Sequence, residues 1–148
     1  GSLDKSSWPK LAIVAVVVAA VVPPLLWRAW DLNALAEGDE VAKSLGVPVE
    51  RSMAGFMLAA SLVTAVIICF TGTIGFIGLV APHITRMAIG ADYRTLIPAS
   101  GLVGAVLLLG ADCLARTAIA GAIIPVGIMT AFLGIPFFLY LFMRRRDV

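Results

Sequence analysis

The strongest constraint on this sequence is a pair of long apolar runs without charged side chains. Leu11 to Leu26 is continuous and apolar, and Met53 to Phe70 carries no charge anywhere. Hydrophobic residues make up 61% of the chain, charged residues only 14%, and the mean hydropathy is +1.04. Ordinary soluble domains are about 45–50% apolar and about 25% charged. A chain of 148 residues has a large surface for its volume, so it cannot hide this much apolar area. We therefore expect a lipid bilayer to be its solvent.

Five apolar segments are candidates for spanning helices, which need about 20 mostly apolar residues each. They are residues 11–26, 53–70, 74–89, 96–119 and 123–143. Pro82 and Pro136 fall inside the third and the fifth. Proline frees a backbone carbonyl that neighbouring helices or water must satisfy, so these two suggest helices that break or pack closely around a cavity, as in transporters. The expected fold class is all-α integral membrane, with about five transmembrane helices, some of them short or broken by proline.

The Lys and Arg residues are distributed unequally between the two sides that five crossings create. One side holds Arg28, Lys43, Arg51, Arg86, Arg94 and Arg144 to Arg146, and the other holds Lys5, Lys10 and Arg116. Because loops rich in Lys and Arg stay in the cytoplasm, we expect the 31–51 loop and the C-terminus there, and the N-terminus outside. Trp8, Trp27 and Trp30 lie at segment ends, as aromatic residues at a membrane surface do.

The only substantial polar stretch is the loop between the first two segments. Glu37, Asp39 and Glu40 crowd the start of a short helical pattern, where acids suit the positive helix end. Val41, Ala42 and Leu45 form one apolar face, Gly46 is a good helix terminator and Pro48 prevents continuation. The segment is either a solvated turn between two membrane helices or a short amphipathic helix that presents its apolar stripe to a cytoplasmic partner.

Asp112 and Arg116 are four residues apart near the end of the fourth segment. That spacing places them on one helix face, where an acid and a base pair. Ionisable residues at membrane depth mark functional sites. Near the membrane surface their cost falls, so a structural pair and a gate or docking contact are equally good interpretations.

Catalytic and metal chemistry find little support. His83 is the only histidine, and a metal ligand needs companions, so a packing role is the better interpretation. Cys69 and Cys113 lie in apolar segments and are expected to be buried thiols. The sequence contains no nucleophile–base pair, no paired carboxylates and no GxxxxGK[ST] phosphate loop. Neither a cofactor, a metal nor a nucleic acid is expected to bind, and energy for uphill transport must come from another subunit.

The stretch FTGTIGFIGLVAPHITR (residues 70–86) is interpreted as architecture. Gly72, Gly75 and Gly78 suggest a closely packed start to a short helix that runs inward from the outer face. Pro82 and His83 lie within that helix, and Arg86 marks its approach to the cytoplasmic side.

Three ordered stretches resemble the membrane subunits of FecCD-type ABC importers, which carry iron-siderophores, haem and cobalamin. They are GFIGLVAPHITRMAIGADYRTLIP, GADCLAR and PVGIMTAFLGIPFFLYLFMRRR, and the loop ALAEGDEVAKSLGV is similar to the coupling segment of the same family. The resemblance covers essentially the whole chain. It implies that residues 1–148 form the C-terminal half, helices six to ten, of a ten-helix permease with a cytoplasmic coupling loop at about 31–51.

The resemblance also implies roles for particular residues. The docking site of a separate ATP-binding subunit, which would hydrolyse ATP, would comprise Glu37, Gly38, Asp39, Glu40, Ala42, Leu45 and Gly46. Arg116 would contact an extracytoplasmic substrate-binding protein. The last helix would line a translocation path between two permease copies, a homodimer, with Pro125, Gly127, Thr130 and Gly134. Other expected partners are the N-terminal half of the permease and membrane lipid.

One position departs from the family pattern, because Ile123 stands where family members commonly carry glutamate. The sequence does not name the chelate. Two alternatives remain open at this point: an ATP-independent secondary transporter or channel, suited by broken helices and the Asp112/Arg116 pair, and a non-transporting membrane scaffold.

Overall fold

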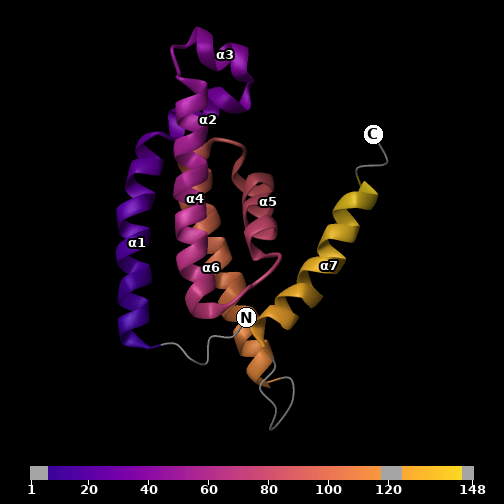
Figure 1. Ribbon diagram of the computed structural model, residues 1–148. Coiled ribbons are helices and arrows are strands. Elements are labelled where there is room, and N and C mark those ends of the chain that lie inside the picture. Colours follow the sequence, from indigo (N-terminus) through magenta and orange to yellow (C-terminus); the bar gives the residue numbers. More distant parts are fainter. Residues whose placement is uncertain (1–6, 118–124, 145–148) are drawn as a thin grey trace.

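The computed structural model describes residues 7–117 and 125–144, whose regular structure is entirely helical (Figure 1). Its helices, in chain order, are α1 (Trp8–Trp27), α2 (Ala29–Ala36), α3 (Asp39–Ser44), α4 (Val49–Thr71), α5 (Ile77–Ile89), α6 (Tyr93–Thr117) and α7 (Val126–Arg144). Each of the five expected segments becomes a helix, and the loop between the first two contains α2 and α3.

Within the described residues, three helices are long and apolar enough to cross a membrane. Helices α1, α4 and α6 have 20, 23 and 25 residues, and at about 1.5 Å per residue each matches a hydrocarbon core of about 30 Å. Helix α5 has only 13 residues, so it spans about two thirds of that thickness. Helix α7 has 19 residues. The expectation of about five membrane helices, some of them short, is confirmed.

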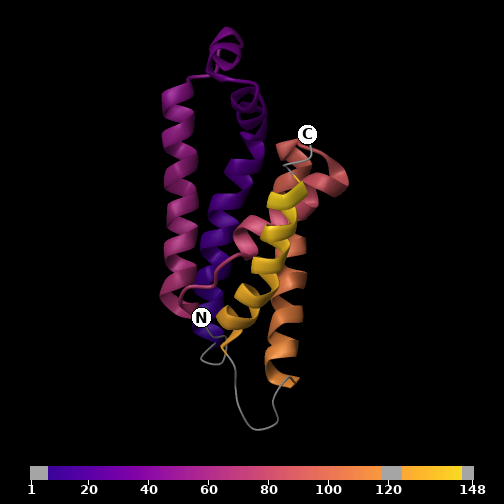
Figure 2. The same ribbon diagram turned by 90° about the vertical axis from the view of Figure 1, so that its right-hand side faces the viewer.

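The described helices form two packed groups. Helix α1 packs on α4, with α2 and α3 at one end of that pair, whereas α5 packs on α6 and both contact α7. Figures 1 and 2 show the two groups, with α2 following the end of α1 beside the start of α4 and α3 beyond both helices. The main noncovalent contact between the groups is α2 against α6. The end of the molecule that carries α2 and α3 is called the cap end below.

The expected helix breaks at Pro82 and Pro136 are not present, because α5 and α7 continue through these residues. The interruption occurs instead at residues 72–76, between α4 and α5. Gly72 ends α4 with a positive φ of 71°, and Phe76 begins α5 with a φ of 67°. A left-handed backbone conformation ends a right-handed helix, whereas membrane helices tolerate a proline when neighbouring groups satisfy the freed backbone carbonyl. The alternative, that these helices pack around a cavity, is met by α5 and α7, although neither proline is among the residues that line the cavity.

The close packing expected at Gly75 and Gly78 is also wrong for this chain, since a Cβ built on either meets nothing within 4 Å. Close approach occurs at Gly104 of α6, whose Cβ would lie 3.6 Å from Ala81 Cβ and 3.7 Å from Ile77 Cγ2. Small residues let membrane helices approach closely. They join α5 to α6 here, with Ala81, Ala111 and Ala115 all buried.

The outer faces of the long helices are covered with exposed apolar side chains. Leu58 of α4 and Leu102 of α6 are 74% and 71% exposed. Cys69 and Cys113 are likewise exposed, which corrects the expectation of buried thiols. In a bilayer, apolar residues need no protein cover, so apolar surroundings in the sequence do not predict burial inside the chain.

Candidate functional site

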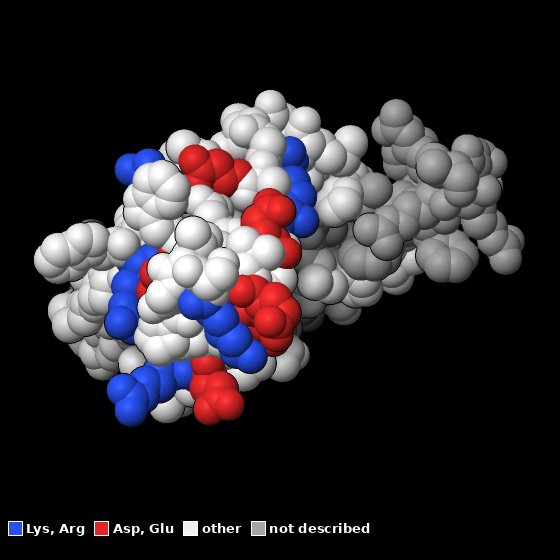
Figure 3. Space-filling model, turned by 90° about the horizontal axis from the view of Figure 1, so that it is seen from above, with Lys and Arg blue, Asp and Glu red and all other residues white. Residues whose placement is uncertain are grey.

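The cap end presents the acidic residues that the sequence singled out. Glu37, Asp39 and Glu40 are all exposed, and the last two lie in the first turn of α3. Lys43 reaches Glu40 at 3.9 Å in an exposed ion pair, which adds little stability. Figure 3 shows acidic and basic side chains interspersed over this end. The acids are therefore accessible to a partner.

Helix α3 ends as the sequence predicts. Gly46 has a φ of 81°, its N–H donates to the Lys43 carbonyl, and the Val47 N–H donates to the Ala42 carbonyl, both at 3.0 Å. These two bonds define a Schellman motif, in which a glycine takes the left-handed position. Gly38, with a φ of 116°, precedes the helix at its N-cap. Two glycines therefore set the ends of the six-residue helix.

The apolar face expected from Val41, Ala42 and Leu45 is divided in the structure. Ala42 has no exposed surface, whereas Val41 is 44% and Leu45 67% exposed. Because the Ala42 side chain is fully buried against the rest of the chain, a docked partner would not contact it. Leu45 lines a hollow of about 460 Å³ between α2 and the end of α3. The remaining lining residues are Trp30, Asp31, Asn33, Ala34, Glu37 and Val47.

A polar junction, which sequence reasoning missed, ties α2 to the start of α6. Asn33 Nδ2 donates to Asp92 Oδ1 at 2.8 Å, and the Tyr93 N–H donates to Asn33 Oδ1 at 2.9 Å. The Arg94 N–H donates to Asp92 Oδ1 at 3.0 Å. The hydrogen bond from Asn33, followed by that from the Arg94 N–H, lowers the pKa of Asp92 from its ordinary value of 3.8. An Asp just before an apolar helix signals an N-cap, but no local pattern reveals that Asn33 joins it.

Two cation–aromatic contacts surround this junction. The Arg94 guanidinium lies 4.8 Å from the centre of the Trp30 ring on α2. Arg86, in the last turn of α5, donates to the Tyr93 hydroxyl at 3.3 Å and lies 5.9 Å from the centre of its ring. Such contacts contribute about 0.5–1 kcal/mol at exposed sites. Helices α2, α5 and α6 therefore meet around one cluster at the cap end.

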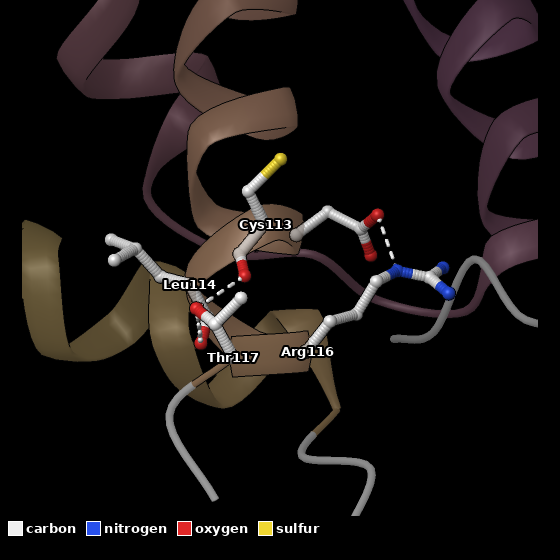
Figure 4. A network of polar contacts seen from close by, with 5 residues as sticks. Cys113, Leu114, Arg116 and Thr117 are labelled. Carbon is white, nitrogen blue, oxygen red and sulfur yellow. Dashed lines mark hydrogen bonds and ion pairs between the residues drawn. The ribbon is translucent and has the colours of Figure 1, made fainter. Parts of the chain in front are cut away.

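At the opposite end of α6, the pair predicted from the i, i+4 spacing is formed. Arg116 Nε donates to Asp112 Oδ2 at 2.8 Å, and the side chains are 52% and 19% exposed. Figure 4 shows Arg116 and Thr117 in the last turn of α6, with the Thr117 hydroxyl donating to the Cys113 carbonyl. The Arg116 side chain is half-exposed at the end of the molecule opposite the cap end. It therefore remains accessible although it is paired with Asp112.

The residues expected along a translocation path have different surroundings. Pro125 is exposed and Gly127 is half-buried at the start of α7, whereas Thr130 and Gly134 are buried. Thr130 and Gly134 line a partly open cavity of about 210 Å³ between α5, α6 and α7. They therefore face the inside of this chain and not the exposed side of α7, which carries Ile128, Phe132, Ile135, Leu139 and Met143.

His83 serves packing, as the sequence suggests. Its ring meets that of Phe137 edge to face, with centres 6.2 Å apart, and so joins α5 to α7. Among the described residues, no group of three or more His, Cys, Asp or Glu side chains is placed to hold a metal ion. Ile123 and Arg145 to Arg146 lie outside the described residues.

The long apolar helices, the charged cap and the second polar end define a multi-pass membrane protein. Comparison with known sequences then gives its family: the FecCD transport family matches residues 1–144, so the chain belongs to this family. This confirms the resemblance drawn from the sequence motifs.

Named relatives agree with this assignment. The chain is 44% identical over 147 residues to the hemin transport system permease protein HmuU of Yersinia pestis, covering 99% of the chain and 44% of HmuU. It is also 44% identical over 150 residues to the cobalamin import system permease protein BtuC of Halobacterium salinarum, covering 100% of the chain and 39% of that protein. The chain thus spans less than half the length of these relatives.

A solved structure shares the fold. It is an inward-facing conformation of a metal-chelate type ABC transporter, which matches 97% of this chain and 46% of its own with a TM-score of 0.86 and 37% sequence identity. The arrangement of helices described above is therefore that of part of an ABC transporter permease. Neither an ATP-independent carrier nor a scaffold is favoured by this family membership.

Proposed function

We propose that this chain is part of the permease subunit of a binding-protein-dependent ABC importer that carries a metal chelate across the cell membrane. The family match over residues 1–144 is the observation that carries the proposal. Equal identity to a hemin and to a cobalamin permease favours a large metal chelate as substrate class: an iron-siderophore, haem or cobalamin. Residues 1–148 would form the C-terminal half of the permease domain, and the missing N-terminal half would supply the remaining helices.

The cap end is proposed to dock the ATP-binding subunit, on which ATP is hydrolysed, so that the permease itself is not an enzyme. Glu37, Asp39, Glu40 and Leu45 are exposed there, and Gly38 and Gly46 set the ends of the helix that presents them. An acidic, partly apolar protrusion suits a partner with a basic groove, because complementary charges guide association.

The distribution of Lys and Arg supports a proposed orientation in the membrane. Arg28, Lys43, Arg51, Arg86 and Arg94 lie at the cap end, and Lys10 and Arg116 lie at the opposite end (Figure 1). The cap and the C-terminus would therefore face the cytoplasm. Arg116 would then face outward, where the substrate-binding protein docks.

The translocation path is proposed to lie along α7, between this chain and a second permease copy in a homodimer. Pro125 and Gly127, at the start of α7, would lie nearest its outer mouth. Thr130 and Gly134 face α5 and α6 across the cavity that they line, so they would position α7 beside the path from within the chain. The exposed apolar face of α7 would contact the second copy.

Charge reversal at the cap tests this function. In the assembled transporter, Glu37→Lys, Asp39→Lys and Glu40→Lys together should abolish ATP-driven substrate uptake, because the cap would repel a basic groove. Membrane insertion should be unchanged, since all three side chains are exposed. Glu50→Lys is the matched control, because Glu50 is an exposed acid in the first turn of α4, outside the proposed docking site.

Two results would contradict the proposal. Unchanged uptake by the triple variant would show that the three acids at the cap end are not needed for coupling to the ATP-binding subunit. Vesicles that accumulate substrate without any ATP-binding subunit would instead show an ATP-independent transporter.

A further inference from the structure

We propose that Asn33 is a positioning residue that links α2, at the cap end, to α6. Movement imposed on α2 and α3 would then reach the helices around the cavity. This inference rests on the proposed transport function. It goes beyond that function by naming the connection between the docking site and the membrane helices.

The arrangement of the helices makes such a link necessary. Helices α1 to α4 form one group and α5 to α7 the other, and the main noncovalent contact between them is α2 against α6. The covalent connection through residues 72–76 lies at the end of α4 away from the cap (Figure 1). A force applied to the cap therefore reaches α6 most directly through α2.

The chemistry of the junction requires an amide at position 33. The Tyr93 N–H needs an acceptor, and Asn33 Oδ1 supplies it at 2.9 Å. The Asp92 carboxylate, which only accepts when ionised, needs a donor, and Asn33 Nδ2 supplies it at 2.8 Å. An apolar side chain satisfies neither group, and a carboxylate at position 33 satisfies only the first.

The junction grips the helix at its end. Asp92 holds the Arg94 N–H with its side chain and the Leu96 N–H with its carbonyl, the latter at 2.8 Å. Asn33 holds the Tyr93 N–H, which has no partner within a helix that begins at Tyr93. The donors at the start of α6 are thus shared between α6 and α2. Displacement of α2 pulls on the backbone of α6 itself.

Helix α6 passes the movement on to the cavity. It packs closely on α5 at Gly104, and the Arg86–Tyr93 hydrogen bond fixes the cap ends of the two helices together. Leu107 and Ala111 of α6 and Ile77 and Val80 of α5 line the cavity with Thr130 and Gly134. A shift of α6 therefore changes the cavity that α7 closes.

A charge exchange across the junction provides the test. Asn33→Asp keeps the acceptor for Tyr93 but places two carboxylates within hydrogen-bond distance of each other. Asn33→Asp combined with Asp92→Asn restores the bond between positions 33 and 92 in reverse, because the new amide at position 92 would donate to the new carboxylate at position 33, which still accepts from the Tyr93 N–H. The Arg94 N–H bond is not restored, since it shares the acceptor atom Asp92 Oδ1 with Asn33. Both variants are made in the complete permease, assembled with its ATP-binding subunit and binding protein in lipid vesicles. The readout is substrate taken up per ATP hydrolysed.

Asn33→Asp should lower uptake per ATP roughly fivefold, the effect of losing about one net hydrogen bond. The double variant should recover part of this loss, since it removes the repulsion between the two carboxylates and restores the bond between positions 33 and 92, and a double-mutant cycle measures that coupling. A merely structural role would lower the yield of assembled complex and leave this ratio unchanged. Unaltered uptake per ATP in Asn33→Asp, or no recovery in the double variant, would overturn the link.

A second measurement needs no substitution. Amide hydrogen exchange at Tyr93 should stay slow with and without a non-hydrolysable ATP analogue, because the junction must move as a unit. Fast exchange in either state would refute the inference. Failure of the proposed function looks different, since the unaltered assembly would then take up no chelate with ATP present.

Discussion

Gly134 of α7 lies directly against the ring of Phe76, so closely that a Cβ on Gly134 would stand 2.6 Å from Phe76 Cγ. Phe76 is the only described non-glycine residue with a positive φ, a conformation that costs L-residues roughly 1–2 kcal/mol. The turn directs its ring onto α7, where it lines the cavity. The strained end of the 72–76 segment and the glycine of α7 therefore form one contact.

Substitution at this contact should separate α7 from α5. Gly134→Ala should lower the free energy of unfolding by about 1–3 kcal/mol, the usual cost of overpacking, because the methyl group and the Phe76 ring compete for one space. Thermal unfolding in detergent measures the change. Gly110→Ala in α6 is the matched control, since a Cβ there meets nothing within 4 Å and alanine favours a helix. Equal stability of the two variants would refute the contact.

The end of α3 should depend on its glycine. Gly46→Ala should destabilise the Schellman turn by about 1 kcal/mol or more, because an added Cβ opposes a φ of 81°. Hydrogen exchange at the amides of residues 46 and 47 should accelerate, and affinity for the ATP-binding subunit should fall several-fold. Gly55→Ala, at an open helical position in α4, should change neither quantity. Unchanged exchange at residue 47 would argue against the motif.

At the end of α6 away from the cap end, the ion pair of Arg116 with Asp112 can be tested separately from the proposed docking of Arg116 to the binding protein. Asp112→Arg combined with Arg116→Asp preserves an ion pair but moves the positive charge one turn inward. If Arg116 docks the binding protein, this exchange should weaken that association roughly tenfold at low salt and less at high salt, because exposed charges are screened. Binding measured against salt concentration gives the answer. If the exchanged variant bound the substrate-binding protein as tightly as the unaltered protein, Arg116 would have a structural role and no docking role.

Acid should weaken the cap junction. The folded-state pKa of Asp92 lies below its ordinary value of 3.8, chiefly because of the Asn33 hydrogen bond. The carboxylate therefore stabilises the fold above pH 3.8, and this contribution is lost as the pH falls through the lowered folded-state pKa. The difference in thermal midpoint between the unaltered protein and Asp92→Asn should be constant from about pH 7 to 5 and shrink below about pH 4. A difference that persists in acid would contradict this account.

Much of the helical arrangement could be predicted because it depends on local patterns. The uncharged runs mark α1 and α4, Gly46 marks the end of α3, and four-residue spacing brings Asp112 to Arg116. The shortness of α5 also follows from its segment. The docking roles of the cap and of Arg116 remain predictions, because their partners lie outside the chain.

The failures have a common physical cause. Pro82 and Pro136 were expected to break helices, but positive φ values at Gly72 and Phe76 make the interruption instead. Ala42 was placed on an exposed face, whereas tertiary packing encloses it. Cys69 and Cys113 were expected inside and lie outside, because lipid solvates apolar residues as well as a protein core does.

That the chain is a membrane protein of the FecCD type could be predicted from its residues, because hydropathy and short motifs are properties of neighbouring residues. Three contacts are visible only in the folded chain: Asn33 accepts from the first N–H of α6, Gly134 lies against Phe76, and Gly104 lies beside Ala81. Each of these contacts joins residues far apart in the chain. They form because unsatisfied helix donors find a distant acceptor and because helices approach closely where a side chain is missing.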